Sequence, residues 1–134
     1  MSTDRAAEVL ATARELVAAF GRHDPDAYFP FFAEDASFVF YTHPDMLNTR
    51  AEWKELWATW EKDFGFRVHS CESHDGVVQM LSDDVAVFRH RVVSDIAFDG
   101  SRDTLVERET IVFTYRDGEW VAIHEHLSPL EGAE

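Results

Sequence analysis

Apolar residues recur every three or four positions near the start of the chain, as on one face of a helix: Val9, Ala13, Leu16, Val17 and Phe20. This spacing predicts a helix over about residues 4–20, with Ser2 or Thr3 as its N-cap. Gly21 follows directly and suits the left-handed position that ends many helices.

A second long helix is predicted after the sequence TRAE. This sequence is a capping box, in which Thr49 caps the helix and Glu52 lies three residues later, and Gly65 marks the end. A largely aromatic stripe follows at helical spacing: Trp53, Leu56, Trp57, Trp60 and Phe64. Two interpretations stay open, because the stripe either packs the helix on a sheet or makes Trp57 part of an aromatic pocket wall.

The remaining segments carry turn and strand signals. Asp24 and Pro25 are a cap and first-turn pair, which predicts a short helix. The strand formers ASFVFYT predict a strand over residues 36–42. From Phe66 onward the turn sequences SHDG, SDD, FDGS and RDG separate five further predicted strands: 66–73, 77–82, 85–98, 104–116 and 119–128.

This order of elements predicts the fold class. Helices followed by an antiparallel meander indicate an α+β fold, with the N-terminal helices on one face of a curved antiparallel sheet. A sheet curved around helices forms a cone, and its open end is a natural cavity for a small molecule. We expect one domain over residues 1–130 and a loose tail over residues 131–134.

Composition and charge narrow the class of partner. The 134 residues contain no apolar run near the roughly 20 residues of a membrane span, and the N-terminus lacks the pattern of an export signal. The net charge of −14 repels nucleic acid and anionic membranes, so we expect neither as a partner. Cys71 is the single cysteine, and we interpret it as a buried thiol of a soluble, cytoplasmic protein.

The closing segment ERETIVFTYRDGEWVAIHEHLSP resembles the nuclear transport factor 2-like superfamily, especially its SnoaL-like members and the association (hub) domain of calcium/calmodulin-dependent protein kinase II. The matching positions follow the family pattern up to its His-x-His-x-Ser ending: Thr110, Asp117, Gly118, Trp120, His124, His126 and Ser128. The resemblance extends more weakly over the whole chain. It implies the cone fold, which ketosteroid isomerase shares, and a homodimer joined through the sheet. It leaves function open, since the superfamily includes isomerases, cyclases, dehydratases and noncatalytic assembly domains.

The chain departs from these relatives at their functional positions. Hub domains line a carboxylate-binding pocket with arginines, and the matching positions here are Val92 or Val93, Ile111 and Leu127. The resemblance therefore does not bring that anion site to this chain. The catalytic aspartate of the cyclases and of ketosteroid isomerase has no matched residue, and HEHLS replaces the His-His-His-Ser-Ser ending of carbonic-anhydrase-like members.

The RDG turn determines which sides of the last two strands meet. Because side chains alternate along a strand, one face of the final strand carries Trp120, Ala122, His124, His126 and Ser128. A two-residue turn would place Glu109 opposite His126, whereas a three-residue loop would place Glu109 opposite Glu125. His126 would then face Arg108. We favour the three-residue loop, because it brings two pocket-arginine positions of the hub relatives to one face.

On this register the more apolar face meets the helices and forms the cone interior: Ile111, Phe113, Tyr115, Val121, Ile123 and Leu127. Glu109 and Glu125 would be paired carboxylates inside an apolar cavity. Desolvation and like-charge repulsion there should raise at least one pKa into a range useful for proton transfer. The alternative is that both carboxylates lie solvated at the cone mouth.

The two C-terminal histidines would then lie outside the cone. Beside Arg108, His124 and His126 would form a polar contact of the homodimer, whose affinity would depend on pH. Two histidines at positions i and i+2 of a strand can also bind one metal ion with a third ligand, for which His90 is nearest by strand order. We predict no metal site and no cofactor.

Two further sets of polar residues are candidates. Tyr41 and His43 share a face at the end of the first strand, where they either orient a ligand or belong to the turn THPD. His90 lies between two arginines, and we expect this cationic group to pair with Glu107 or Glu109 across the sheet.

The sequence therefore predicts a protein that binds a small, largely apolar molecule. If it is an enzyme, it is a cofactor-free isomerase, cyclase or dehydratase with Glu109 or Glu125 as the base. The residues predicted to bind the ligand are Tyr41, His43, Trp57, Arg108, His124 and His126. The alternative is a noncatalytic association module that assembles into a homodimer or a larger homo-oligomer.

Overall fold

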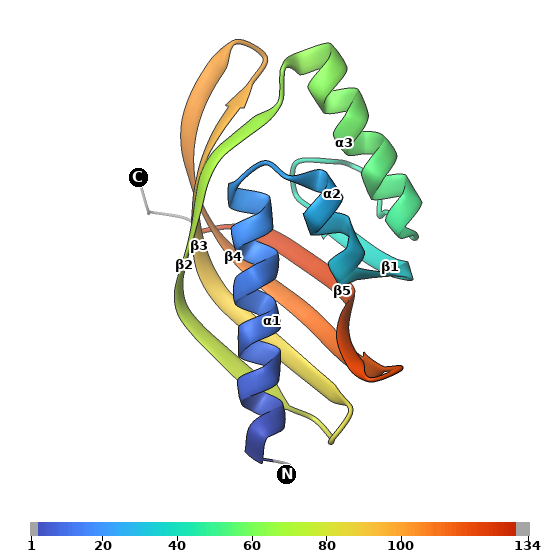
Figure 1. Cartoon of the computed structure of the whole chain (residues 1–134). Helices are drawn as coiled ribbons and strands as arrows, with labels where there is room; N and C mark the ends of the chain where they lie inside the picture. Colours follow the sequence, from blue (N-terminus) through green and yellow to red (C-terminus); the bar gives the residue numbers. More distant parts are fainter. Residues whose placement is uncertain (1–2, 131–134) are drawn as a thin grey trace.

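The structure is a computed structural model and describes residues 3–130. Three α-helices and a short 3-10 helix accompany a five-stranded sheet (Figure 1). The helical segments are α1 (Thr3–Gly21), α2 (Pro25–Tyr28), the 3-10 turn η1 (Phe29–Phe31) and α3 (Arg50–Phe64). The strands are β1 (Phe32–Phe40), β2 (Arg67–Met80), β3 (Val85–Phe98), β4 (Ser101–Arg116) and β5 (Glu119–Pro129).

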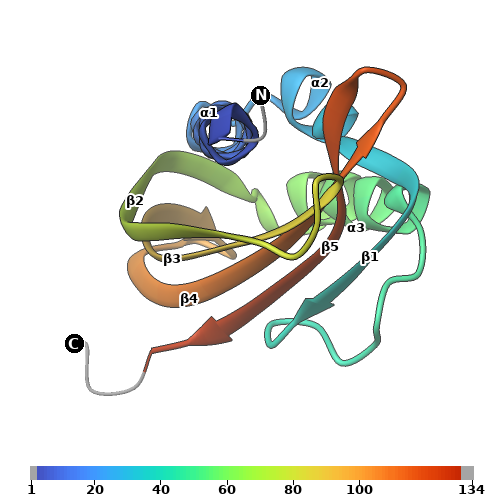
Figure 2. The ribbon, with the colours of Figure 1, turned by 90° about the horizontal axis from the view of Figure 1, so that it is seen from below.

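The helices cover one face of a strongly curved sheet. Seen from below, the sheet bends around them (Figure 2). The strand order is β1-β5-β4-β3-β2, and α1 packs on β2 and β3 while α3 packs on β1. The predicted fold class is confirmed. The β2–β5 meander is antiparallel, and β1 joins its β5 edge in parallel, so the complete sheet is mixed.

The predicted helix signals mostly act as expected. Asp24 caps α2 by accepting a hydrogen bond from Ala27 N, and Thr49 caps α3 by accepting one from Glu52 N. Gly65 ends α3 in the left-handed conformation. The predicted cap at Ser2 or Thr3 lies outside the residues whose side chains are described, and so does the tail at 131–134.

Gly21 has another role than the one predicted. It is the last residue of α1 and does not adopt a positive φ, which the chain reaches at His23 with φ 54°. A Cβ atom at Gly21 would lie 3.2 Å from the backbone nitrogen of Cys71. The glycine therefore allows α1 to approach β2 closely.

Two of the predicted strand boundaries were wrong. The sequence SHDG does not separate two strands, because β2 continues through it with a bulge between His74 and Val77. Asp75 has φ 58°, which allows the extra residues without breaking the strand. β1 starts at Phe32, four residues before the predicted strand, since the aromatic run leads directly into it.

The predicted register of β4 and β5 was also wrong. The hairpin has a two-residue turn, with φ 51° at Asp117 and 85° at Gly118, and Tyr115 pairs with Trp120. A bulge at Ile123 then shifts the pairing by one residue, so that Glu125 lies opposite Ile111 and not opposite Glu109.

The bulge changes which residues of β5 point to the inner face of the sheet. Before it, Trp120 and Ala122 are buried on the inner face in place of the predicted Val121 and Ile123. After it, Glu125 and Leu127 continue that inner face. The predicted alternation from Trp120 to His126 is therefore interrupted between Ala122 and His124.

Among residues 3–130, no helix is both long enough and apolar enough to cross a membrane.

Candidate functional site

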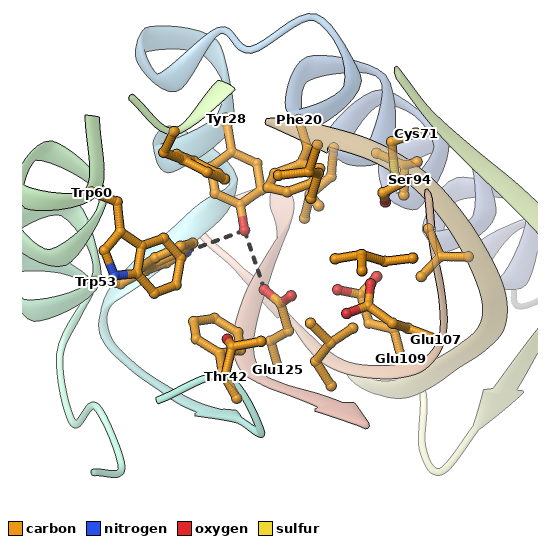
Figure 3. Close-up of a pocket in the computed structure, with 18 of the residues that line it drawn as sticks. Phe20, Tyr28, Thr42, Trp53, Trp60, Cys71, Ser94, Glu107, Glu109 and Glu125 are labelled. Carbon is orange, nitrogen blue, oxygen red and sulfur yellow. Dashed lines mark hydrogen bonds between the residues drawn. The ribbon is translucent and has the colours of Figure 1, made fainter. Parts of the chain in front are cut away.

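A cavity of about 220 Å³ lies between the helices and the concave face of the sheet (Figure 3). Its wall is mainly apolar and draws on helices and on all five strands of the fold. The aromatic lining residues are Phe20, Tyr28, Phe40, Trp53, Trp60, Phe66 and Phe98. Three carboxyl groups also reach it, from Glu107, Glu109 and Glu125.

Glu109 and Glu125 come together from neighbouring strands. Glu109 lies on β4 opposite Leu127, and Glu125 lies on β5 opposite Ile111, so that both side chains point to the inner face. Glu125 is 4% exposed, and the Glu109 side chain is 11% exposed. The structure therefore places both carboxyls inside the cone and not at a solvated mouth.

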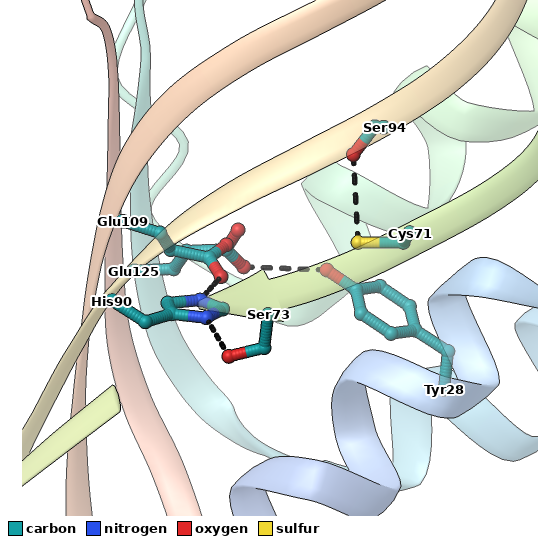
Figure 4. A network of polar contacts seen from close by, with 7 residues as sticks. All are labelled: Tyr28, Cys71, Ser73, His90, Ser94, Glu109 and Glu125. Carbon is teal, nitrogen blue, oxygen red and sulfur yellow. Dashed lines mark hydrogen bonds and ion pairs between the residues drawn. The ribbon is translucent and has the colours of Figure 1, made fainter. Parts of the chain in front are cut away.

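A chain of hydrogen bonds holds this pair (Figure 4). On one side, Glu109 Oε1 lies 2.6 Å from His90 Nε2, and Ser73 Oγ lies 2.6 Å from His90 Nδ1. On the other side, the Tyr28 hydroxyl donates to Glu125 Oε1 over 3.2 Å. The indole N–H of Trp53 donates to the same hydroxyl over 3.2 Å.

The two carboxyls influence each other's ionisation. Burial raises the pKa of both carboxyls; the Glu109 charge raises that of Glu125 further, whereas the hydrogen bond from Glu125 lowers that of Glu109. Glu109 is thus the first to ionise, and Glu125 keeps the proton. Burial raises the pKa of the Tyr28 hydroxyl, and to a smaller extent so does the charge that Glu125 carries when it ionises. Tyr28 therefore stays protonated and acts as a hydrogen-bond donor.

The protonation states fix the direction of each bond. Burial lowers the pKa of the His90 imidazole to about 4, against the opposing effect of Glu125, so His90 is neutral near pH 7. Because an ionised carboxylate only accepts, His90 Nε2–H donates to Glu109. His90 Nδ1 then accepts from the Ser73 hydroxyl. The expected pairing of His90 with Glu109 across the sheet is present.

The other predicted ligand-binding residues do not line this cavity. Trp57 is 2% exposed and packs inside the aromatic core. His43 belongs to a separate shallow depression with Asp45 and Glu52. The exposed Tyr41 donates to Glu107 Oε2 over 2.6 Å, so it reaches the site through that carboxylate.

The outer face carries the remaining candidates. Arg108 lies opposite Ser128, and His126 lies opposite Thr110. His124 Nδ1 is 2.8 Å from Ser37 Oγ on β1. His90 projects from the inner face, so it does not converge with the two C-terminal histidines on one metal ion.

Sequence reasoning missed Tyr28, Ser73 and Glu107 as members of the site. In the sequence, Tyr28 lies in an aromatic run and is typical of an apolar core residue. In the structure its hydroxyl contacts the carboxyl of Glu125, 97 residues away. Ser73 falls at the end of a predicted strand. Glu107 was expected only as a partner of cationic residues; its position two residues before Glu109 is the signal that places both side chains on one strand face.

The sequence model of the SnoaL-like domain matches residues 9–131. Comparison with curated proteins gives no match.

Three solved structures illustrate the likeness of the fold. A ketosteroid isomerase-like protein from Erwinia carotovora has a TM-score of 0.80 and 19% identity, covering 96% of this chain and 98% of that one. A nuclear transport factor 2-like protein from Rhodospirillum rubrum, described as of unknown function in nutrient uptake, has a TM-score of 0.78 and 22% identity, covering 91% and 98%. The calcium/calmodulin-dependent protein kinase II hub homology domain of Chlamydomonas reinhardtii has a TM-score of 0.73 and 20% identity, covering 94% and 98%. At these identities the likeness concerns the fold.

Proposed function

Because the chain belongs to the SnoaL-like family, we propose that it binds a small, largely apolar molecule in the cavity and catalyses cofactor-free proton transfer on it. One observation carries the proposal: two buried carboxyls from neighbouring strands lie together on the wall of a mainly apolar cavity, where burial raises the pKa of both. Environments that separate two pKa values in this way produce a base and an acid at the same pH.

The two carboxyls take different roles in this proposal. Ionised Glu109 accepts a proton from a carbon acid of the ligand, and His90 holds its carboxylate in place. Glu125 is kept neutral, and its single O–H, which faces Glu109 in the free protein, turns to donate a hydrogen bond to the ligand oxygen on which charge develops, while Tyr28 fixes the other carboxyl oxygen. Isomerisation, cyclisation and dehydration can each proceed by such a transfer without a cofactor.

Deuterium exchange tests the chemistry even when the product has not been identified. The protein is incubated in D₂O with a panel of small cyclic ketones and enones, and loss of α-proton signals is followed by NMR. We expect faster exchange with at least one compound and, for Glu109→Gln, a loss of at least about 100-fold, the lower range for a general base. The matched control is His126→Gln on the outer face. Exchange that is equally fast with Glu109→Gln would contradict the role of Glu109.

We also propose that the chain forms a homodimer through the outer face of the sheet. This face carries His124, His126 and Arg108, and its polar side chains suit a hydrated interface. Native mass spectrometry of gently purified protein reports subunit number and retained small molecules together. A dimer with an organic adduct supports the cavity function. A larger ring without adduct would favour a noncatalytic association module, for which the fold likeness to the hub homology domain is the specific observation.

A further inference from the structure

Glu107 is a buried carboxyl that the proposed chemistry does not use. It is 4% exposed, lines the cavity and lies on the same strand face as Glu109. Its neighbours across the sheet are Val92 and Pro129, neither of which has a side-chain donor. Within residues 3–130, its side-chain hydrogen-bond partner is the Tyr41 hydroxyl, at 2.6 Å.

The cavity supplies no counter-charge for this carboxyl. Its lining residues, within the part of the chain that the structure describes, include no arginine, lysine or histidine. Arg91, one position before Val92, projects from the other side of β3 and lies 3.6 Å from Asp75. Burying a carboxylate costs several kcal/mol unless it is paired. Burial accordingly raises the pKa of Glu107, against the hydrogen bond from Tyr41.

Surface carboxylates of the same chain are treated differently. Asp95 receives two hydrogen bonds of 2.9 Å from Arg102, and Asp35 lies 3.2 Å from Arg116. Arginines therefore pair with surface carboxylates, which water already solvates. The carboxyls of the cavity receive hydrogen bonds from uncharged groups, namely tyrosine hydroxyls and the neutral His90. A cation brought by a ligand would provide what the wall lacks.

The opposite wall fits the rest of such a ligand. Trp53 and Trp60 lie across the cavity from Glu107 and Glu109 (Figure 3). Their rings are 5.4 Å apart at an interplanar angle of 74°, so they form a broad apolar corner. The cavity thus has an acidic end and an aromatic end.

We infer that the ligand is a small apolar amine, bound as its ammonium ion with the nitrogen against Glu107 and the hydrocarbon part against Trp53 and Trp60. This inference rests on the proposed function, since it assigns the chemical class of ligand for the same cavity. Glu109 and Glu125 remain available for proton transfer, and Glu107 is a recognition group.

Three probes of matched shape test the assignment: cyclohexylmethylamine, cyclohexylmethanol and cyclohexanecarboxylate. Each is titrated into the unmodified protein at pH 8 by isothermal calorimetry, where an alkylamine is still protonated. We expect the amine to bind at least about tenfold more tightly than the alcohol, and the carboxylate to bind most weakly, as expected for a charge-assisted contact. Equal binding of amine and alcohol would overturn the inference and leave the apolar cavity function standing. Absence of binding by all three would remove both.

Two variants locate the binding charge. Glu107→Gln keeps the shape of the side chain and an oxygen for Tyr41, and we expect it to abolish the preference for the amine over the alcohol. Asp95→Asn is the matched control, because it removes one negative charge from the surface and not from the cavity. The preference of this variant for the amine over the alcohol should stay unchanged. An unchanged preference in Glu107→Gln, or its loss in Asp95→Asn, would mean that Glu107 is not the group that attracts the amine and would overturn the assignment.

A measurement on the unmodified protein keeps the test valid if Glu107→Gln does not fold. The four tryptophans give separate indole N–H signals in NMR spectra. The amine should shift the signals of Trp53 and Trp60 and leave that of Trp120 unchanged, since Trp120 lies outside the cavity lining. Shifts confined to Trp120 would contradict the assigned site.

Discussion

Neighbouring residues of β5 occupy opposite environments. Glu125 is buried on the inner face, where its carboxyl meets Glu109 and Tyr28. His124 and His126 flank it on the outer face, the first half-buried against Ser37 and the second exposed. Titratable groups one residue apart in sequence therefore serve different parts of the molecule, because strand geometry separates them by the thickness of the sheet.

The comparison shows that desolvation distinguishes the two faces more than residue type does. Among the histidines, inner His90 is held neutral by burial, whereas outer His124 has a pKa lowered by partial burial and by the neighbouring His126 charge. Both histidines are consequently coupled to folding stability through their pKa shifts, the inner His90 more strongly than the outer His124. The outer groups are available for an interface.

The largest effect should come from removing the aromatic bulk beneath the inner face. Trp57→Ala should lower the free energy of unfolding by about 3–5 kcal/mol, because it leaves a cavity in the core. Urea denaturation measures the loss. The control is Lys54→Ala at an exposed position of α3, which should change the free energy of unfolding by less than about 0.5 kcal/mol. A loss below about 1 kcal/mol for Trp57→Ala would restore the interpretation of Trp57 as a pocket-wall residue.

Acidification should then separate inner from outer histidines. The folded-state pKa of His90, about 4, lies below the ordinary histidine value of 6.5, so the unfolded chain binds the proton first as pH falls. Neutral His90 therefore makes its full contribution to the free energy of unfolding above pH 6.5. This contribution, on the order of 3 kcal/mol, is lost as pH falls toward 4. The difference in unfolding free energy between wild type and His90→Gln should change by this amount across the window. The same comparison with His124→Gln, whose side chain is only partly buried, should change by less, and a matching slope for both variants would refute the distinction.

Glu125→Gln should produce a smaller effect of opposite sign. A raised pKa of the Glu125 carboxyl means that the folded state binds the proton more tightly than the unfolded state does. The contribution of protonated Glu125 to the free energy of unfolding is therefore present at low pH and is lost as pH rises through the folded-state pKa. The Gln amide imitates protonated Glu125: it donates to Glu109 and accepts from Tyr28. We expect equal stability of variant and wild type near pH 4 and a more stable variant near pH 9. Thermal unfolding across this range measures the difference, and a constant difference would contradict the raised pKa of Glu125.

Features fixed by local hydrogen bonds could be predicted from the sequence. Asp24, Thr49 and Gly65 act within one helical turn, and the structure has each where the prediction placed it. The order of helices and strands followed from periodicity, which indicated the fold class. The parallel addition of β1 to β5 could not be seen in the same way, because it joins segments that are distant in the sequence.

The candidate site was predictable only where strand alternation sufficed. Glu109 and Glu125 were expected inside the cone, and both line the cavity, but through another register than the predicted one. The bulge at Ile123 leaves no signal in the sequence. Tyr28 reaches Glu125 from α2, and Ser73 reaches His90 from β2, so their roles required the tertiary arrangement.

The smallest expected effect concerns association through the outer face. A dimer interface that covers His124 would desolvate it further, so its protonated form would oppose association. Dimer affinity should therefore fall by about two- to fivefold between about pH 8 and pH 5.5, equivalent to roughly 0.5–1 kcal/mol. Sedimentation equilibrium at both pH values measures it, and the substitution His124→Gln should flatten the profile. Glu125→Gln, one residue away but on the inner face, should leave the profile unchanged. If it flattened the profile as well, the two faces of β5 would be coupled and not independent, and their separation by the sheet would no longer explain their different roles.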